Sequence, residues 1–465
     1  MPVLGGEARH VSRRAALLGM VGAVPGGVAV FRAGTPTTVA ETTTTGDEHT
    51  DVGAVRLQDL LDRLEAGAVV HVTRHWTLDE SLRVERPMTI RFVGGSLSTA
   101  CDIDLVLVTS SDVRMVDAVL TGGGADHSGL GRGIRALGTV AAPLRNVQVV
   151  RATIRQFSHD GVLYEHCTEF VVTGSTIEDV GYAGVLLFSC VGGSVTNNRI
   201  ARVVQPAPYV NSYGIEAVRA TSTGLDGAPR SARVLIADNH VSDVPNWEGI
   251  DTHGGESISI LRNRVDGCRV GIAVVPSKDE HDDKATKYAP LDFAVVDNVV
   301  TRTVTGPGSG IVVRGAGETV GSDAERATGA VLRNTVTGYG DGDRDAAILV
   351  YLTRHLVIGH NRCDAGVRRG VSLYHSNDRV TLVGNLVTGL RRQGTATSVA
   401  VDVRATANSA VLLGNEYRAA GGVDSVYGVM CRQADNDLVL VSNDWRATTT
   451  AVVASTGTVV RYRET

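Results

Sequence analysis

Aromatic residues are scarce in this sequence. Phe, Trp and Tyr together make up 4% of the 465 residues, although apolar residues reach 43% and glycine occurs 54 times. A chain with so few large side chains cannot build its core around a handful of aromatic anchors, so many small stacked side chains must form it. Repetitive β architectures build their cores in this way. The composition therefore favours a repeating all-β chain over a series of ordinary globular domains.

The sequence also lacks the features of three other protein classes. The net charge is −5, so there is no basic field that would hold DNA or RNA. The six cysteines show no CxxC pair and no Cys/His cluster at zinc spacing, which argues against a structural zinc site and a disulfide-dense scaffold. After the N-terminal region, no segment approaches the ~20 consecutive apolar residues that a membrane-spanning helix needs. We therefore expect neither nucleic acid nor a membrane as a partner.

The N-terminus carries a pattern typical of export. Arg13 and Arg14 follow Ser12 and precede the modestly apolar stretch 15–31. This arrangement resembles a twin-arginine signal peptide, although Ala16 and Leu18 stand where Phe and Lys are usual. The resemblance implies that residues 1–34 are a signal peptide, that the Thr-rich residues 35–50 are a linker, and that the mature protein is secreted or otherwise outside the cytoplasm.

One short pattern recurs from about residue 145 to the C-terminus: an apolar residue, two others, Asn, one other, and an apolar residue. Its asparagines are Asn198, Asn239, Asn263, Asn298, Asn334, Asn361, Asn385, Asn415 and Asn443. The shortest interval is 24 residues, which matches one coil of three short strands and is shorter than helical repeats. We expect each Asn to adopt the left-handed backbone conformation at a tight bend, with stacked side-chain amides bonded in a ladder.

An Asn ladder of this kind resembles the pectate-lyase-like superfamily over about three quarters of the chain. The resemblance implies a single right-handed, single-stranded parallel β-helix of about 11–13 coils over residues 51–465, with an N-terminal cap in 51–100. Within the cap, residues 55–67 have apolar residues at helical spacing and end in Gly, so we expect a helix that covers the first coil. Cys167 and Cys190 occupy matched positions of two consecutive repeats; buried stacked thiols are favoured over a disulfide bridge.

A second motif, Gly followed by Ile or Val, begins one strand of each coil. Strict alternation places the Ile or Val inward and the next residue outward. The first outward column then contains Leu163, Leu186, Glu216, Asp251, Ala273, Val312, Leu349 and Ser372. The second contains Glu165, Phe188, Val218, His253, Val275, Arg314, Tyr351 and Tyr374. Because coils stack ~4.8 Å apart, Glu216 and Asp251 should be neighbours, with His253 on the same face.

Long insertions flank this same strand, at 201–212, 219–232, 276–292, 304–309, 315–327 and 338–346. Long loops on one side of a solenoid usually form its binding face. We expect them to bring several side chains to one rim for substrate binding: Tyr209, Tyr213, Arg219, Trp247, Lys278, Lys284 and Tyr288, with Tyr351 and Tyr374 continuing the groove. A solvated loop is favoured over a calcium site for the acidic segment 278–284, and surface or cap contacts are favoured for His159, Asp160 and His166.

Three hypotheses follow for this face, all with a polysaccharide as partner and none requiring a cofactor. In the first, His253 removes the C5 proton of a uronate, Arg314 or Arg219 neutralises the sugar carboxylate, Tyr213 or Tyr288 donates a proton and Asp251 orients the imidazole. Residues 249–255 resemble the Asp-Pro-His motif of alginate C5-epimerases, with Thr252 in place of Pro; the resemblance implies a lyase or epimerase.

The second hypothesis is a retaining glycoside hydrolase. Glu216 and Asp251, one coil apart, would have carboxyl groups ~5 Å apart, and their repulsion would raise the pKa of one of them. The combined motifs of β-helical polygalacturonases are missing, which places this hypothesis second. The third hypothesis is a non-catalytic solenoid that binds glycan. Aromatic platforms for sugar rings would favour it, but aromatic residues are scarce in this sequence.

Overall fold

The computed structural model describes Glu41–Thr43 and residues 54–463, apart from 127–128, 209–210, 283, 341, 365, 367, 392–396 and 420–425. The expected signal peptide (1–34), most of the expected linker (35–50) and Tyr209 lie outside the described residues. Three residues of that linker, Glu41–Thr43, form strand β1, which pairs with β2. Residues 41–465 form one compact unit. Within the described part of the chain, no helix combines the length and apolar character required to cross a membrane.

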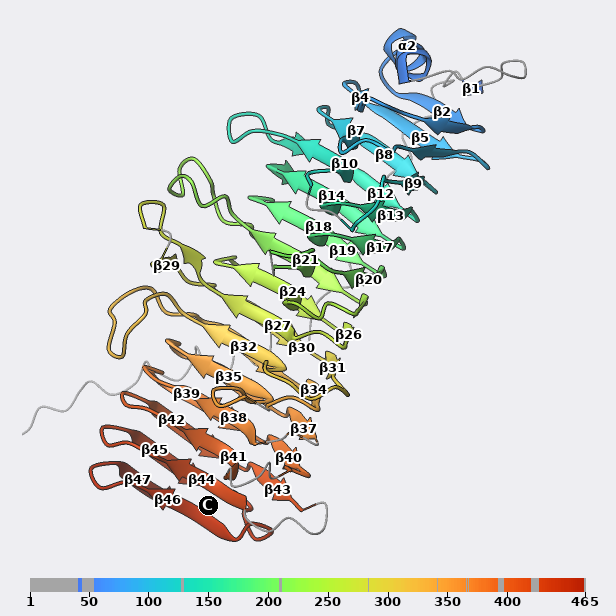
Figure 1. The fold of residues 1–465 in the computed structure, drawn as a ribbon. Helices are drawn as coiled ribbons and strands as arrows, with labels where there is room; N and C mark the ends of the chain where they lie inside the picture. The colour runs from blue at the N-terminus through green and yellow to red at the C-terminus, as the bar shows by residue number, and fades with distance from the viewer. Residues whose placement is uncertain are drawn as a thin grey trace, which may run out of the picture. The chain divides into compact units, whose positions relative to one another are not determined.

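Three long parallel sheets of 16, 14 and 13 strands run along the stack, and each complete coil contributes one strand to each sheet (Figure 1). The 14-stranded sheet contains β4 (Leu82–Val84), β7 (Asp104–Val108), β10 (Arg132–Leu137), β14 (Asp160–Glu165), β18 (Ala183–Phe188), β21 (Tyr213–Val218), β24 (Glu248–His253), β27 (Val270–Val275), β32 (Ile311–Arg314), β35 (Ile348–Tyr351), β38 (Arg369–Leu373), β41 (Ser398–Val403), β44 (Val426–Cys431) and β46 (Thr450–Ala454). The 13-stranded sheet contains β3 (His75–Thr77), β6 (Ser96–Ser98), β9 (Val119–Thr121), β13 (Thr153–Phe157), β17 (Thr176–Val180), β20 (Arg199–Val203), β23 (His240–Ser242), β26 (Arg264–Asp266), β31 (Val299–Thr301), β34 (Thr335–Thr337), β37 (Arg362–Asp364), β40 (Leu386–Thr388) and β43 (Glu416–Arg418).

The 16-stranded sheet contains β1, β2 (Ala68–Val72), β5 (Met88–Phe92), β8 (Val113–Val116), β12 (Gln148–Val150), β16 (Val171–Thr173), β19 (Ser194–Thr196), β22 (Leu235–Ala237), β25 (Ser259–Leu261), β30 (Phe293–Val296), β33 (Gly329–Leu332), β36 (Val357–Gly359), β39 (Val380–Val383), β42 (Ser409–Leu413), β45 (Asp437–Val441) and β47 (Val459–Arg463). Two short pairs complete the strands: parallel β11 (Leu144–Arg145) with β15 (Cys167–Thr168), and antiparallel β28 (Ser277–Lys278) with β29 (Thr286–Tyr288). The thirteen strands of the 13-stranded sheet match the upper end of the expected 11–13 coils.

The ladder of asparagines is continuous through all nine predicted positions. Each side-chain amide donates a hydrogen bond to the amide oxygen of the next Asn, at 2.8–3.0 Å. The expected left-handed conformation, however, was assigned to the wrong residue. Positive φ occurs one position earlier, at residues such as Asp238, Arg262 and Asp297. The preceding residue makes the bend, and the Asn is required for its buried amide, which also bonds the backbone carbonyl of another coil.

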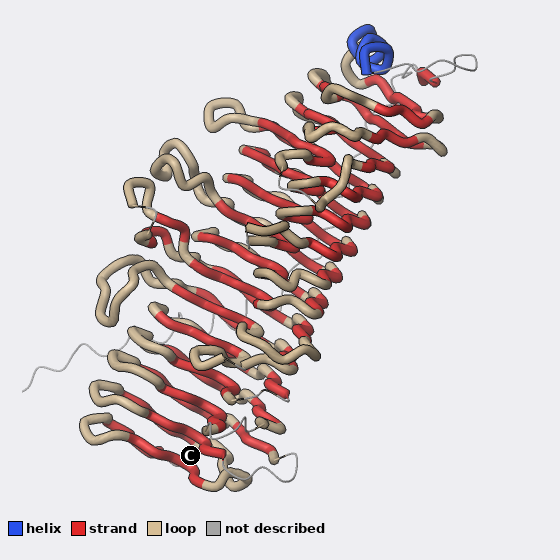
Figure 2. The backbone as a smooth tube through the Cα atoms, in the orientation of Figure 1, coloured by secondary structure: helices blue, strands red, loops and turns tan. Residues whose placement is uncertain are grey.

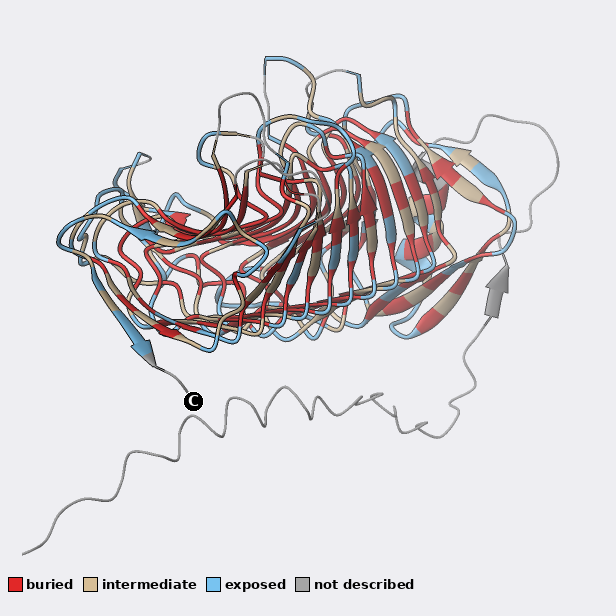
Figure 3. Cartoon of the chain, turned by 90° about the horizontal axis from the view of Figure 1, so that it is seen from below, coloured by how far each residue is buried: buried red, intermediate tan, exposed pale blue. Residues whose placement is uncertain are grey.

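Small aliphatic side chains fill the interior, as the composition predicts. One continuous hydrophobic cluster runs from Leu57 to Trp445 and consists mostly of Val, Ile, Leu and Ala. Figure 3 shows exposed residues concentrated in the turns and loops around these strands. Cys167 and Cys190 are buried free thiols, in agreement with the favoured alternative.

A short helix caps the first coil, as predicted, although it spans Ala54–Arg63 (α2) and ends before Gly67. It is the blue helix of Figure 2. Its own side chains Leu57 and Leu61 are buried. The Gln58 side chain accepts a hydrogen bond from the backbone N–H of Arg83 (2.8 Å) and donates one to the Arg83 carbonyl (3.1 Å). The helix therefore supplies hydrogen-bond partners to the backbone of the first strand of the 14-stranded sheet, whose outer edge would otherwise be unpaired.

The predicted insertions are loops in the structure, and all of them flank the 14-stranded sheet. The loops that follow β21, β27 and β32 project from the same side of the stack (Figure 1). Residues 276–292 contain the unexpected β28–β29 hairpin. The outer face of the 14-stranded sheet is therefore the face around which the long loops gather.

Candidate active site

Two neighbouring strands, β21 and β24, carry the predicted acidic and imidazole side chains. Their register pairs Glu216 with Asp251, and Tyr213 with Glu248. The first outward column is confirmed on both sides of this pair. Leu163, Leu186 and Glu216 pair in turn on one side, and Asp251 pairs in turn with Ala273, Val312, Leu349 and Ser372 on the other. The long-range prediction that distant residues become vertical neighbours on one face is therefore correct.

The start of each strand departs from strict alternation. Gly249 and Ile250 both face the interior: a Cβ at Gly249 would lie 2.5 Å from Val265 Cγ1 and 2.9 Å from Cys268 Sγ. Only glycine fits so close to the neighbouring strand. As a result Glu248, which alternation places inside, lies on the outer face, where it pairs in register with Tyr213, whose ring contacts His253. After burial, the charge of Asp251 is the next cause that raises the pKa of Glu248. Sequence reasoning missed Glu248 because it assumed strict alternation, although the repeated Gly-Ile pair was the signal that could have identified it.

Glu216, Asp251 and His253 form a compact cluster. One ligand atom from each side chain lies within 4.8 Å of the others, and His253 Nε2 is 3.1 Å from Asp251 Oδ2. The Asp251 side chain is 0% exposed, whereas the His253 side chain is 30% exposed. Both oxygens of Asp251 and one oxygen of Glu216 are buried without a hydrogen-bond partner. The imidazole is thus the accessible group, and the carboxyl groups lie behind it.

Burial controls the protonation of the carboxyl groups. It raises the pKa of Glu216 well above its ordinary value, and the neighbouring charge of Asp251 raises it further. Burial likewise raises the pKa of Asp251, and burial followed by the charge of Asp251 raises that of Glu248. Burial and the neighbouring charge therefore both favour the protonated form of the carboxyl groups in this cluster.

A row of rings leads along the outer face to this cluster. His159 stacks on Tyr182 with 4.6 Å between ring centroids, Tyr182 meets Tyr213 edge-on at 5.4 Å, and Tyr213 meets His253 edge-on at 6.4 Å. Burial, followed by the charge of Glu216, raises the pKa of both tyrosines, so their hydroxyl groups stay protonated. Tyr213 is buried, whereas Tyr182 is half-buried. Tyr182 was not predicted, because it lies in the turn just before its strand.

Asp160 is buried, so the expectation of a surface residue is wrong. Its side chain is 0% exposed, with Arg132 Nε 2.9 Å and His159 Nδ1 2.8 Å from one of its oxygens. Asp160 begins β14 and occupies the position equivalent to Glu248 in the register. The same inward Gly that moves Glu248 to the outer face explains this position. His166 lies at a bend with positive φ after β14.

Arg219 and Tyr288 are not a free substrate-binding rim. Arg219 is 1% exposed, and its guanidinium group donates to the carbonyls of Ala228 (2.9 Å) and Thr223. The Tyr288 ring lies 4.5 Å from this guanidinium group, and its hydroxyl donates to Glu280 at 2.8 Å. These contacts hold the long loops together, a role that spacing alone could not reveal. Lys278 and Lys284 are exposed on the same hairpin.

Of the remaining predicted substrate-binding and catalytic residues, Trp247 lies near the cluster, whereas Arg314, Tyr351 and Tyr374 lie farther along the same face. Trp247 is half-buried beside Glu248, with the Arg269 guanidinium group 4.9 Å from its ring. Arg314, Tyr351 and Tyr374 lie on β32, on β35 and just after β38, two to four coils beyond β24. Arg314 is bound to Glu318 at 2.7 Å. The structure therefore does not bring Arg314 next to His253, because two coil steps separate them by ~10 Å.

Glu216, Asp251 and His253 have the chemistry to hold a divalent cation, with two carboxylates and one imidazole as ligands. Among the described residues, no comparable group of His, Cys, Asp and Glu occurs in the acidic segment 278–284. There Glu280 is bound to Lys287 at 2.6 Å.

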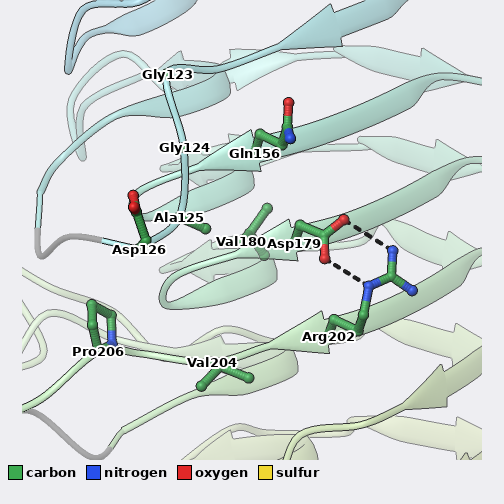
Figure 4. Close-up of a pocket in the computed structure, with 10 residues that line it drawn as sticks. All are labelled: Gly123, Gly124, Ala125, Asp126, Gln156, Asp179, Val180, Arg202, Val204 and Pro206. Carbon is green, nitrogen blue, oxygen red and sulfur yellow. Dashed lines mark hydrogen bonds and ion pairs between the residues drawn. The ribbon is translucent and has the colours of Figure 1, made fainter.

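A separate pocket lies away from this cluster (Figure 4). It is lined by Gly123, Gly124, Ala125, Asp126, Gln156, Asp179, Val180, Arg202, Val204 and Pro206. The guanidinium group of Arg202 is already bound to Asp179 (2.6 Å) and Glu178 (2.7 Å). None of the predicted site residues lines this pocket.

Comparisons with known proteins agree with this topology. Residues 133–283 match the family described as the right handed beta helix region. The fold is a right-handed parallel β-helix. No curated protein sequence matches the chain.

Three solved structures illustrate the likeness of fold. The catalytic unit of the thermostable GH87 α-1,3-glucanase from Streptomyces thermodiastaticus has a TM-score of 0.55 at 14% identity, covering 92% of this chain and 70% of that one. A mutant tailspike protein of E. coli bacteriophage HK620, in complex with a hexasaccharide, has a TM-score of 0.53 at 11% identity, covering 88% and 74%. The Azotobacter vinelandii mannuronan C-5 epimerase AlgE6 A-module has a TM-score of 0.42 at 14% identity, covering 89% and 95%. At these identities the likeness concerns the fold alone.

Proposed function

We propose that this β-helix is an exported enzyme that acts on a uronate-containing polysaccharide by removing the C5 proton. The observation that carries the proposal is the accessible His253 imidazole held 3.1 Å from the buried Asp251, beside Glu216, on the face where the long loops gather. Two proteins of the same fold, a glucanase and a tailspike bound to a hexasaccharide, support a polysaccharide as the partner. Export is inferred from the twin-arginine pattern.

In the proposed reaction, His253 accepts the C5 proton as the C5–H bond breaks. The electron pair moves toward the sugar carboxylate. The Glu216 and Asp251 carboxyl groups are buried behind His253, so they act on the imidazole and not on the sugar. Asp251 Oδ2, 3.1 Å from His253 Nε2, pairs with the imidazolium that forms when His253 has taken the proton. In a lyase the C4–O bond then breaks and the leaving oxygen takes a proton, whereas in an epimerase C5 is reprotonated from the opposite face. The protonated Tyr182–Tyr213 pair supplies that proton.

Hydrolysis is the second candidate. Glu216 and Asp251 are cross-strand neighbours with raised pKa values, an arrangement that suits a retaining mechanism. However, a nucleophile must reach the anomeric carbon, and the Asp251 side chain is 0% exposed behind His253. Proton abstraction by the accessible imidazole therefore ranks first.

The test is a panel of uronate and neutral polysaccharides incubated with the protein and followed in three ways. A lyase produces new ultraviolet absorbance, an epimerase incorporates solvent deuterium without cutting the polymer, and a hydrolase releases reducing ends without new absorbance. We expect one of the first two with a uronate polymer. Reducing ends alone would support hydrolysis, and no change in any readout would support a glycan-binding solenoid.

His253→Ala should lower turnover by about 10²–10⁴-fold, the usual contribution of a general base. His240→Ala is a matched control, because His240 lies on β23 of the 13-stranded sheet with a carboxylate, Asp266, at a similar 3.0 Å, and its side chain is 37% exposed. Its turnover should equal that of the wild type. Equal activity of the two variants would contradict the assignment of His253.

A further inference from the structure

A second charged cluster lies farther along the same face. The register extends the His253 column through Val275 and Arg314 to Tyr351. The next three coils continue this column with Tyr374, Arg404 and Arg432. Each of these residues directly follows a residue whose cross-strand pairing is established: Val350 with Leu373, Leu373 with Val403, and Val403 with Cys431. At ~4.8 Å per coil, Arg404 is ~24 Å from His253 along the groove. Tyr351, Tyr374, Arg404 and Arg432 therefore lie in the same column as the candidate base.

Guanidinium groups outnumber carboxylates in this second cluster, which we call the arginine cluster: Arg344, Arg368, Arg369, Arg404 and Arg432, with Asp343, Asp345 and Asp402. Asp402 is fully buried and pairs with Arg369 (2.5 Å) and Arg432 (3.1 Å). Arg369 is itself buried and also donates to loop carbonyls. Arg369 and Asp402 thus form the rigid base of the cluster, on which the more exposed arginines rest.

One surface carboxylate already occupies the cluster. The Asp343 side chain is 77% exposed, yet its oxygens lie 3.3 Å from Arg368, 3.9 Å from Arg369 and 3.7 Å from Arg404. The charge of Arg404 is the main cause that lowers the pKa of Asp343. Three guanidinium groups converging on a single exposed carboxylate form a site that an external carboxylate would fit equally well.

A tyrosine platform adjoins this position. The guanidinium groups of Arg404 and Arg344 lie 5.5 Å and 5.8 Å from the centre of the Tyr374 ring, and Tyr351 meets that ring edge-on at 5.7 Å. Both tyrosines are half-buried, so part of each ring reaches the groove. A ring beside a carboxylate-binding arginine offers an apolar surface for a sugar ring and a charged group for its carboxylate.

We propose that Tyr374, Arg404 and Arg344 form a distal subsite for a uronate residue, and that the Asp343 carboxylate stands in for the sugar carboxylate when no substrate is bound. This inference rests on the proposed function and specifies its substrate: a polyanion of several sugar residues, bound along the column from His253 to Arg404. The carboxyl groups around Asp251 offer no positive charge to an anionic polysaccharide. The arginine cluster therefore supplies the positive charge that binds the polysaccharide.

The test measures binding by isothermal titration calorimetry with a galacturonate hexamer, a galacturonate dimer and a neutral glucose hexamer. Arg404→Gln should weaken binding of the uronate hexamer about tenfold, which corresponds to the loss of about one charge-assisted hydrogen bond. Asp343→Asn should strengthen it, because the internal competitor is removed. Arg446→Gln is the control, since Arg446 is an exposed arginine paired with one aspartate, Asp444, in a turn after the 13-stranded sheet.

The dimer should bind more weakly than the hexamer, and its affinity should not depend on Arg404, because it cannot span both ends of the column. Unchanged hexamer binding in Arg404→Gln, or equal binding of the neutral hexamer, would overturn the subsite. Binding to His253→Ala separates the two proposals. If that variant binds the hexamer like the wild type while the wild type turns over no uronate polymer, the subsite stands and the proposed chemistry fails. If His253→Ala abolishes turnover while Arg404→Gln leaves binding intact, the chemistry stands and the subsite fails.

Discussion

Replacing Glu216 by Gln tests whether the acidic cluster holds protons in the folded protein. Burial raises the pKa of Glu216 in the folded state above the value of about 4.3 expected in the unfolded chain. The folded protein therefore keeps a proton that the unfolded chain releases. Stability from such a group is fully present below the unfolded pKa and is lost as the pH rises through the folded pKa. The wild type should become less stable as the pH rises above about 5.

The magnitude follows from the number of protons that differ between the two states. Each proton contributes a slope of up to about 1.4 kcal/mol per pH unit. Glu216→Gln keeps the shape of the side chain and removes one titrating group from the acidic cluster. As the pH rises above about 5, the variant should therefore gain free energy of unfolding relative to the wild type, by up to about 1.4 kcal/mol per pH unit until the folded-state pKa of Glu216 is passed.

The assay is urea denaturation followed by circular dichroism at a series of pH values, with Glu85→Gln as the control because Glu85 is exposed near the N-terminal cap. The free energy of unfolding of the control should follow the wild type at every pH. If the curve for Glu216→Gln runs parallel to the wild type as well, Glu216 is ionised in the folded protein, and the raised pKa of its carboxyl group is refuted.

Two further predictions concern the ladder and the cluster. Asn298→Ala should lower the free energy of unfolding by at least about 3 kcal/mol, because it removes the buried oxygen that accepts from both the backbone N–H and the side-chain amide of Asn263, and the donor to the Ile260 carbonyl. Urea denaturation checks this, and Asn443→Ala, at the partly exposed end of the ladder, should cost less. Zn²⁺ should inhibit turnover by binding between Glu216, Asp251 and His253, whereas EDTA should leave it unchanged, because the proposed base acts uncoordinated. Loss of activity in EDTA would instead make His253 a metal ligand.

The periodic part of the structure could be predicted from the sequence. The Asn ladder recurs with the same flanking apolar residues, so register across distant coils follows from aligning the repeats. That alignment placed Glu216 beside Asp251, although the two residues belong to different coils. The bend was assigned to the wrong residue, because both Asn and its predecessor were candidates for positive φ and spacing does not separate them.

The loops could not be predicted in the same way, because they do not repeat. Arg219 has the chemistry of a rim residue, but the loop folds over it and its carbonyls consume the guanidinium donors. Asp160 is bound by the adjacent His159, but its arginine partner, Arg132, comes from the preceding coil, 28 residues earlier, and could not be read from the local sequence. Burial therefore could not be predicted for residues whose partners lie in non-repeating segments.

The site depends on one local departure from alternation. In the coils of this face that carry the Gly, such as those of Gly214, Gly249 and Gly271, the Gly and the following Ile both point inward. The residue before the Gly and the residue after the Ile therefore both belong to the outer surface. A strand with strict alternation would present Asp251 and His253 but bury Glu248 inside the core without a partner, which is costly for a carboxyl group. The close inward packing of Gly249 against Val265 is what adds a third carboxyl group to the outer face. The position of this carboxyl group therefore follows from a packing feature of the coil, and other coils of the same face could acquire an acidic cluster through substitutions at these two outward positions alone.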